Sequence, residues 1–217
     1  MATSTSRSLA AVVLAAGRGK RFRTATPKVL HPVCGRPLLW HAIRNALAAK
    51  PDRLVVVVAP GSDTVIDAVR SWDLSPKPTF VVQEEPLGTG HAVLAARSAV
   101  GRVDEVLVVG GDFDPVSPDD VRALLRLHRR TGSAASILTA EVDEPKGYAR
   151  IVRDGNRLLD IVEGSDAPAA LRAQPAWDAP AVNAPSAAAP TLFDLAEGLY
   201  DAGTSGLLGG GTVPYAP

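Results

Sequence analysis

Two short segments of the sequence combine glycines with cations in a way that suits a polyphosphate ligand. Residues 14–21 read Leu-Ala-Ala-Gly-Arg-Gly-Lys-Arg, so Gly17 and Gly19 lie beside three basic side chains, and residues 27–31 read Pro-Lys-Val-Leu-His and add Lys28. Glycines let a backbone approach a ligand closely with its N–H groups free, and cations neutralise phosphate charge. The pattern therefore predicts a site for a nucleoside triphosphate.

Two other interpretations of the first segment are a common structural turn and a signal peptide. A glycine-rich turn between strand and helix is common in α/β proteins, and this one follows neither the P-loop order nor the three-glycine dinucleotide fingerprint. The segment also resembles a signal peptide, with Arg7 as the charged region and Leu9–Ala16 as a short apolar core. We disfavour a signal peptide because such segments are removed, whereas this one continues directly into the cationic loop.

Composition limits the class of protein. The chain has 217 residues, 46% of them hydrophobic, which is enough for one domain with a substantial core. The 23 basic residues balance the 23 acidic ones, so the overall charge favours neither nucleic acid nor a membrane surface as a partner. No apolar run approaches the roughly 20 residues that span a bilayer, and the single Cys34 excludes an intramolecular disulfide. We expect a single domain over residues 1–217 in a cytoplasmic protein.

Apolar runs and helical segments alternate over the first two thirds of the chain. Nearly continuous apolar strands separated by helices indicate an α/β fold, with a Rossmann-like, mostly parallel sheet and helices on both faces. The predicted strands are Ala10–Ala15, Leu54–Ala59, Thr79–Gln83, Val106–Val109 and Ser136–Val142. The predicted helices are Pro37–Ala49, Asp63–Trp72 with Ser62 as its cap, Thr89–Ala99, and Val121–Arg130 opened by Ser117 or Asp119.

Candidate site residues follow several of these strands. Ligands of open α/β sheets bind beyond the carboxyl ends of the strands. The glycine–arginine loop, Gln83 and Asp112 each follow a predicted strand. We therefore expect them to converge at one edge of the sheet.

The character of the chain changes after residue 142. Tyr148–Arg153 and Arg157–Val162 flank Asp-Gly-Asn, a turn signal that predicts a β-hairpin. Residues 167–190 contain eleven Ala and five Pro, so regular structure is not expected there. The glycine-rich residues 201–217 are expected to form a loose tail.

Short motifs occur in a fixed order over roughly residues 8–165. They are Leu14-Ala15-Ala16-Gly17 with Gly19 and Arg21, Pro27-Lys28-Val29-Leu30-His31, Gln83 with Leu87-Gly88-Thr89-Gly90-His91-Ala92, Gly111-Asp112, Gly147-Tyr148 with Arg150-Ile151, and Ile161-Val162-Glu163. This ordered set resembles the sugar nucleotidyltransferase family, most closely the uridylyltransferase domain of the bifunctional N-acetylglucosamine-1-phosphate uridylyltransferases. The resemblance implies a nucleotide-diphospho-sugar transferase fold.

The resemblance also implies a role for each matching position. A nucleotide-binding part would occupy residues 8–142 and a smaller sugar-binding part, with the hairpin, residues 143–200. The implied nucleotide contacts are Leu14, Ala15, Ala16, Gly17 and Gly19 through the backbone, Arg21 and Lys28 on the phosphates, and Gln83, Gly88 and Thr89 on the uracil. Asp112 would hold Mg²⁺, and the sugar phosphate would lie near Ala149, Glu163 and Asn183.

The sequence departs from the family pattern in several places. Lys20 replaces a small hydroxyl residue, and an extra residue after Asp112 makes Asp114 a competing metal ligand. Ala149 replaces a glycine, and Asn183 is followed by Ala-Pro and then Ser-Ala-Ala-Ala instead of an apolar strand. The family's second metal ligand, an Asn, has no counterpart in the sequence before Pro217.

The function that this resemblance implies is uridylyl transfer from UTP to a sugar-1-phosphate, with N-acetylglucosamine-1-phosphate as the leading acceptor. Three alternatives stay open: another phosphorylated acceptor, nucleotide binding without turnover, and cytidylyl or guanylyl transfer on the same fold. The β-helix that trimerises bifunctional members of the family is not encoded in this sequence. A monomer or weak dimer is therefore expected.

Overall fold

The computed structural model describes residues 7–17, 24–112 and 116–139, together with the backbone of strands at 150–154, 157–162 and 182–183. The chain divides into two compact units, Met1–Arg122 and Ala123–Pro217. The long helix α5 (Pro118–Thr131) begins in the first unit and ends in the second. A single transferase domain over residues 1–217 stays a prediction.

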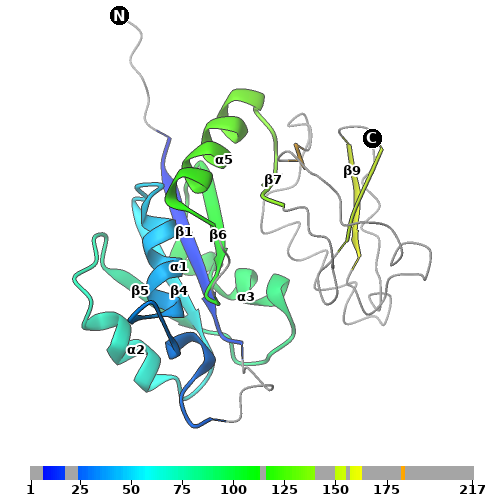
Figure 1. Cartoon of the computed structure of the whole chain (residues 1–217). Helices are drawn as coiled ribbons and strands as arrows, with labels where there is room; N and C mark the ends of the chain where they lie inside the picture. The colour runs from blue at the N-terminus through cyan, green and yellow to red at the C-terminus, as the bar shows by residue number, and fades with distance from the viewer. Residues whose placement is uncertain are drawn as a thin grey trace, which may run out of the picture. The chain divides into compact units, whose positions relative to one another are not determined.

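A parallel four-stranded sheet forms the centre of the first unit (Figure 1). Its strands β5 (Pro78–Val82), β4 (Arg53–Val58), β1 (Leu9–Ala15) and β6 (Glu105–Gly110) lie in that order. The two inner strands, β1 and β4, are built from apolar residues that are almost entirely buried, as expected for strands covered on both faces. The strand order reverses between β1 and β6, which creates a topological switch point beside β1.

The register brings the carboxyl ends of the strands level with one another. Leu14 pairs with Val57 of β4 and with Gly110 of β6. Val58, the last residue of β4, pairs with Val82, the last residue of β5. Residues that follow these strands therefore emerge along the same edge of the sheet, as the sequence predicted.

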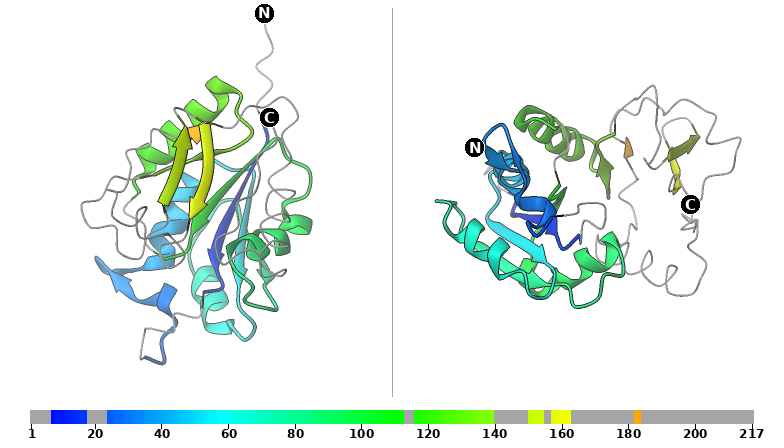
Figure 2. Two further views of the ribbon diagram at one scale, coloured as in Figure 1. Left: turned by 90° about the vertical axis from the view of Figure 1, so that its right-hand side faces the viewer. Right: turned by 60° about the horizontal axis from the view of Figure 1, so that its bottom comes forward.

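Helices cover both faces of this sheet (Figure 2). Alternate residues of β1 and β4 pack with α1 (Leu38–Leu47) and α2 (Asp63–Arg70) in one hydrophobic core cluster, which includes Leu39 and Ile43. The chain then returns from β5 to β6 through α3 (Thr89–Ala95) and α4 (Arg97–Val100). Right-handed crossovers after the order reverses place α3 and α4 on the opposite face. The predicted α/β class is confirmed.

Most predicted elements are present, and three differ in detail. The predicted helix Thr89–Ala99 is interrupted at Ala96, which ends α3 and precedes α4. Ser62 precedes α2, but its side chain makes no capping hydrogen bond. The predicted strand Ser136–Val142 is limited to β7 (Ser136–Ile137) among the described residues, because Leu138 and Thr139 are not paired.

Short connecting elements complete the first unit. The 3-10 helix η1 (Lys28–Leu30) follows Pro27, and the two-residue strands β2 (Pro32–Val33) and β3 (Arg36–Pro37) form a tight hairpin ahead of α1. The buried Val29 fixes η1 to the core cluster. This loop thereby holds the Pro-Lys-Val-Leu-His motif against the sheet.

The second unit contains antiparallel strand pairs. Strands β8 (Arg150–Asp154) and β9 (Arg157–Val162) pair with an irregularity between Val152 and Arg153, which confirms the predicted hairpin. Strand β10 (Val182–Asn183) pairs with β7. β10 lies within the stretch where regular structure was not expected, so that expectation is wrong for these two residues.

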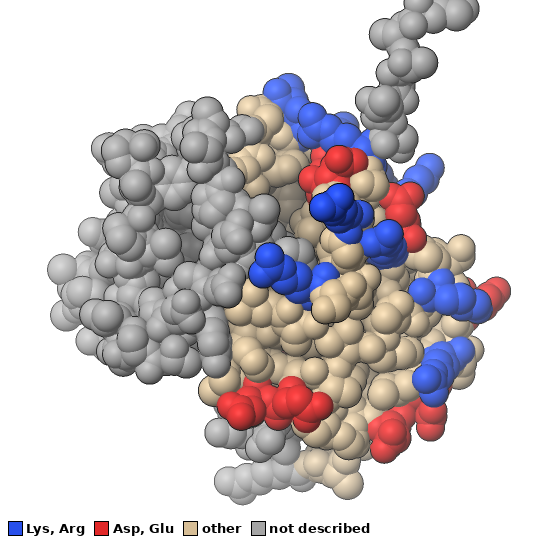
Figure 3. Space-filling model, turned by 180° about the vertical axis from the view of Figure 1, so that it is seen from behind, with Lys and Arg blue, Asp and Glu red and all other residues tan. Residues whose placement is uncertain are grey.

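The described surface carries charges of both signs. On the face shown in Figure 3, basic and acidic side chains lie near one another in several small groups, and uncharged surface separates these groups. That distribution follows from the balanced composition and does not form one continuous basic surface on this face. Among the described helices, none is long and apolar enough to cross a membrane.

Candidate functional site

Backbone packing brings the end of β6 against the end of β1. The Gly111 N–H donates a hydrogen bond to the Leu14 carbonyl at 2.8 Å. A Cβ atom at Gly111 would lie 2.5 Å from that same carbonyl oxygen, which is too close for any side chain. Glycine at this position therefore lets the chain carry Asp112 to the switch point beside β1.

Lys28 meets Asp112 at this edge of the sheet. The Lys28 Nζ donates to the Asp112 Oδ2 at 2.5 Å, although 84 residues separate the two in the sequence. This hydrogen bond is the main reason why the pKa of the Asp112 carboxyl is lowered, and the lysine charge adds to it while partial burial opposes it. The Asp112 side chain keeps 54% of its surface exposed, against 24% for Lys28. The pair is therefore open to a ligand.

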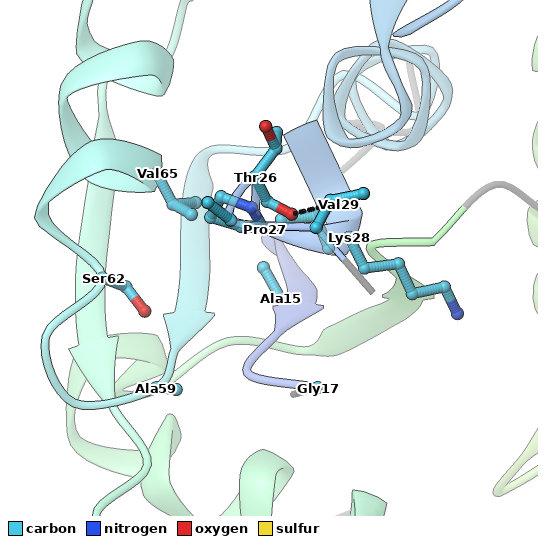
Figure 4. A pocket seen from close by; sticks show the side chains of 11 residues that line it. Ala15, Gly17, Thr26, Pro27, Lys28, Val29, Ala59, Ser62 and Val65 are labelled. Atoms are coloured by element: carbon cyan, nitrogen blue, oxygen red, sulfur yellow. Dashed lines mark hydrogen bonds between the residues drawn. The ribbon is translucent and has the colours of Figure 1, made fainter. Parts of the chain in front are cut away.

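A pocket of about 370 Å³ lies beside this pair (Figure 4). Gly17 and Ala59 lie at the ends of β1 and β4, and a Cβ added at Gly17 would meet no other atom within 4 Å. The Lys28 side chain extends away from the wall formed by Ser62 and Val65. The full lining is Ala15, Gly17, Thr24, Ala25, Thr26, Pro27, Lys28, Val29, Ala59, Ser62 and Val65. This volume is in the range of small-molecule sites.

His31 organises the loop that forms one side of the pocket. Its Nε2 lies 2.9 Å from the Thr24 Oγ1 and 3.2 Å from the Thr26 carbonyl oxygen. The His31 carbonyl also accepts a hydrogen bond from the Leu38 N–H at 3.0 Å. The histidine therefore shapes the Thr24–Thr26 backbone next to Lys28.

Gln83 and its neighbours form a second cluster at the end of β5. The Gln83 N–H donates to the Val58 carbonyl at 2.8 Å, which continues the sheet by one residue. Its carboxamide nitrogen lies 3.1 Å from the Gly88 carbonyl oxygen and 3.1 Å from the His91 Nδ1. Gly88 adopts a φ of 105°, a conformation that favours glycine, directly before α3. Gln83 thus holds the start of α3 to the edge of the sheet.

The structure brings part of the predicted site together and leaves part undescribed. Ala15, Gly17 and Lys28 line the pocket, Asp112 pairs with Lys28, and Leu14 and Ala16 lie at and just after the end of β1. Gln83 contacts Gly88, which precedes Thr89, at the end of β5. Asn183 lies in β10 of the second unit, where only the backbone is described. The predicted residues Gly19, Arg21, Asp114, Ala149 and Glu163 lie outside the described residues.

Sequence reasoning missed several residues of this edge. Thr24, Ala59 and Ser62 line the pocket, and His91 contacts Gln83, yet none of them was predicted as a site residue. Ala59 and Ser62 follow β4, so the rule that singled out Gln83 and Asp112 could also have identified them. Thr24 offered no comparable signal.

Asp112 suits a magnesium ion that a phosphate ligand would share. Among the described side chains, no group of three or more His, Cys, Asp and Glu could hold a metal. Mg²⁺ needs no such cage, because it commonly binds one or two carboxylates together with substrate phosphates and water. The ammonium group on the Asp112 Oδ2 shows that this carboxylate can receive a cation from the ligand side.

Comparison with known proteins gives both a family and relatives. Residues 11–203 match the MobA-like NTP transferase domain. The Bifunctional protein GlmU of Thermus thermophilus is 44% identical over 163 residues, which is 75% of this chain and 35% of that protein. The protein of the same name from Ralstonia nicotianae is 45% identical over 161 residues, 72% of this chain and 33% of that protein. The chain spans about a third of the length of these curated relatives.

Solved structures share the fold. A Bacillus anthracis protein described as a glucose-1-phosphate thymidylyltransferase has a TM-score of 0.64 at 20% identity, with 82% of this chain and 69% of that chain covered. A UDP-glucose pyrophosphorylase complexed with UDP-glucose has a TM-score of 0.58 at 22% identity, with 72% and 69% covered. These likenesses establish a nucleotide-diphospho-sugar transferase fold, as the sequence predicted.

Proposed function

The chain belongs to the MobA-like NTP transferase family and is a sugar nucleotidyltransferase related to the uridylyltransferase domain of GlmU, so we propose that it transfers a uridylyl group from UTP to a sugar-1-phosphate. The second product of this reaction is pyrophosphate. N-acetylglucosamine-1-phosphate is the leading acceptor. The observation that carries the proposal is the pairing of Lys28 with Asp112 at the switch point, next to the open pocket at Gly17. A nucleoside triphosphate with Mg²⁺ needs a cation for its phosphates, a carboxylate for the metal, and a backbone that the phosphates can approach closely, as at Gly17.

The reaction needs positioning more than proton transfer. A phosphate oxygen of the sugar-1-phosphate is already anionic, so it attacks the α-phosphorus of UTP without a general base. The new P–O bond forms as the bond from the α-phosphorus to the bridging oxygen breaks, and pyrophosphate leaves with that oxygen. The barrier therefore lies in bringing two polyanions together and stabilising the departing charge.

Lys28 and Asp112 would divide this electrostatic task. The Lys28 ammonium group can leave Asp112 for a phosphate oxygen, since a pair this exposed contributes at most about 1 kcal/mol to stability. Asp112 would then hold Mg²⁺, which supplies charge neutralisation on the phosphates when bound. Arg21 is proposed to join Lys28 on the phosphates, with the backbone of Leu14 to Gly19 around the nucleotide.

The remaining assignments of substrate contacts are proposals of the same kind. Gln83, Gly88 and Thr89 would contact the uracil, and Ala149, Glu163 and Asn183 the sugar phosphate. We further propose Mg²⁺ as the cofactor, a cytoplasmic location, and a monomer or weak dimer.

Pyrophosphate release tests this function directly. The common nucleoside triphosphates are crossed with a panel of sugar-1-phosphates, each with Mg²⁺ and with excess chelator. We expect turnover with UTP and one sugar-1-phosphate that disappears with chelator. If no combination released pyrophosphate although the protein still bound UTP, the result would contradict uridylyl transfer and favour a nucleotide-binding protein.

A further inference from the structure

We propose that His91 is a positioning residue that fixes the orientation of the Gln83 carboxamide and so makes the base site select a ring nitrogen that carries a proton. This inference rests on the proposed function, because it assumes that the base of the nucleotide reaches Gln83. It concerns which base is accepted, a question separate from whether transfer occurs.

The contact with the Gly88 carbonyl identifies which end of the carboxamide is the nitrogen. A carbonyl oxygen can only accept a hydrogen bond, so the atom 3.1 Å from the Gly88 oxygen must be the amide nitrogen of Gln83. The opposite orientation would place two acceptor oxygens against each other. The hydrogen bond to Gly88 therefore fixes the identity of the two atoms at the end of the Gln83 side chain.

The same nitrogen also contacts His91. Its second N–H faces the His91 Nδ1 at 3.1 Å, and this contact requires an Nδ1 without a proton. The proton of the neutral ring must then be on Nε2. Both amide hydrogens of Gln83 are thereby used, one on Gly88 and one on His91.

The carboxamide oxygen is the part of Gln83 left for a ligand. Gln83 is only 6% exposed, and no described residue donates a hydrogen bond to its Oε1. Buried polar atoms normally have a partner, and an unsatisfied one costs free energy. A donor from a bound base would satisfy this oxygen.

The bases differ in the group they would offer to this oxygen. Uracil, thymine and guanine carry an N–H on the ring nitrogen of the pairing edge, whereas cytosine and adenine carry a bare acceptor nitrogen there. An amide held with its oxygen toward the base accepts from the first group and opposes the second. A site built to use one hydrogen bond rejects a ligand that cannot make it more strongly than a purely apolar pocket does.

His91 keeps the amide from rotating into the other orientation. Without His91, the Gly88 carbonyl alone would hold the nitrogen, and a rotated amide could present its N–H groups to cytosine. The loss of one hydrogen bond of this kind corresponds to about a tenfold change in selectivity. We therefore expect the UTP-to-CTP affinity ratio to fall about tenfold when the acceptor at position 91 is removed.

Equilibrium binding of UTP and CTP to the full chain, without a sugar acceptor, provides the test. His91→Leu should lower the affinity ratio, and His91→Asn, whose side-chain oxygen can stand where Nδ1 stands, should restore most of it. His41→Leu is the matched control, because it removes a hydrogen-bonded histidine of α1 that contacts the Val33 carbonyl instead. A ratio unchanged in His91→Leu, or equal weakening of both ligands, would overturn the proposal.

A second measurement uses the unmodified protein and needs no variant to fold. In protein with ¹⁵N-labelled histidine, NMR reports which ring nitrogen of His91 carries the proton. We expect an unprotonated Nδ1, and a protonated Nδ1 would overturn the proposal. Failure of the proposed function looks different, because the unmodified protein would then show no preference for UTP over CTP or no pyrophosphate release.

Discussion

At the amino end of β1, carboxylates accept hydrogen bonds from backbone N–H groups, whereas beyond its carboxyl end a carboxylate accepts from the side-chain ammonium group of a lysine. Asp52 accepts from the Leu9 N–H at 2.8 Å, and Asp104 accepts from the Ser8 N–H at 2.7 Å. Asp112 instead accepts from the Lys28 Nζ. The carboxylates at the amino end satisfy backbone N–H groups of the fold. The charge of Asp112 is exposed, where a ligand could reach it.

The ion pairs at the two ends show the same difference. Arg7 and Glu105 lie 3.2 Å apart near the start of β6, and the Glu105 side chain is only 3% exposed. The Asp112 side chain of the Lys28 pair is more than half exposed. A buried carboxylate is costly to leave without its partners, but an exposed pair can exchange partners at little cost. The carboxylate of the pair at the amino end is therefore held inside the fold, whereas Asp112 at the other end is exposed at the proposed site.

The largest expected effect comes from the carboxyl end. Asp112→Asn keeps the shape of the side chain but removes the charge that would hold Mg²⁺. We expect pyrophosphate release to fall by about 10²–10³, as for the loss of a comparable electrostatic contact. The free energy of unfolding should change by less than about 1 kcal/mol, because the pair is exposed.

Asp104→Asn is the matched control for that variant at the amino end, and it should leave turnover unchanged. Turnover assays and denaturant unfolding are measured on both proteins. If Asp112→Asn kept full activity, the proposal that the carboxyl end of the sheet carries the chemistry would be wrong.

Gly111→Ala should weaken the fold at the carboxyl end. The added methyl group would lie 2.5 Å from the Leu14 carbonyl oxygen, so β6 would have to move away from β1. We expect a loss of about 1–3 kcal/mol in unfolding free energy, typical of overpacking. Thermal or urea unfolding measures it, with Gly17→Ala as the control because its Cβ would meet no atom within 4 Å. Equal stability of the two variants would contradict the close packing at Gly111.

Asp52→Ala should lower stability and leave chemistry intact. The variant removes the acceptor for the N–H of the buried Leu9, which we expect to cost about 1 kcal/mol. Asp52→Asn keeps an oxygen that can accept this hydrogen bond and should lose less. Unfolding and turnover are both measured. A drop in turnover of well-folded Asp52→Ala would contradict the prediction that Asp52 acts on stability alone.

The smallest expected effect is a pH dependence at Asp104. Hydrogen bonds from the backbone and then the side chain of Ser8 lower the pKa of the Asp104 carboxyl below its ordinary value. A lowered pKa in the folded state contributes stability above the unfolded value and loses it as the pH falls through the folded value. Urea unfolding of Asp104→Asn should therefore depend less on pH in the acid range than that of the unmodified protein. Identical pH profiles would contradict this role.

The sheet, and the edge at which the candidate site residues gather, could be predicted from the sequence because both depend on local patterns. Apolar β-branched runs mark β1 and β4, and the strand-end rule places Gly17 and Asp112 at one edge. The interruption at Ala96 was not predictable, because no glycine or proline marks it and tertiary packing decides where α3 ends.

Contacts between side chains that are distant in the sequence could also not be predicted from it. The bond between Lys28 and Asp112 depends on how η1 packs on the sheet through Val29. The carboxamide of Gln83 was assigned to a base, but nothing in the sequence shows that Gly88 and His91 take up its nitrogen. Spacing identifies which residues gather, whereas the orientation of a polar group depends on the complete set of partners.

The burial of β1 makes this strand an internal reporter of ligand binding. Val12 and Val13 are fully buried, and β1 is paired with strands on both sides, so their amide hydrogens should exchange only when the whole unit unfolds. A ligand that binds the folded chain slows such exchange by the factor 1 + [L]/Kd, even where it touches no atom of the reporting residue. Exchange at these two amides can therefore measure the affinity of a nucleotide at the site proposed beyond the carboxyl end of this strand.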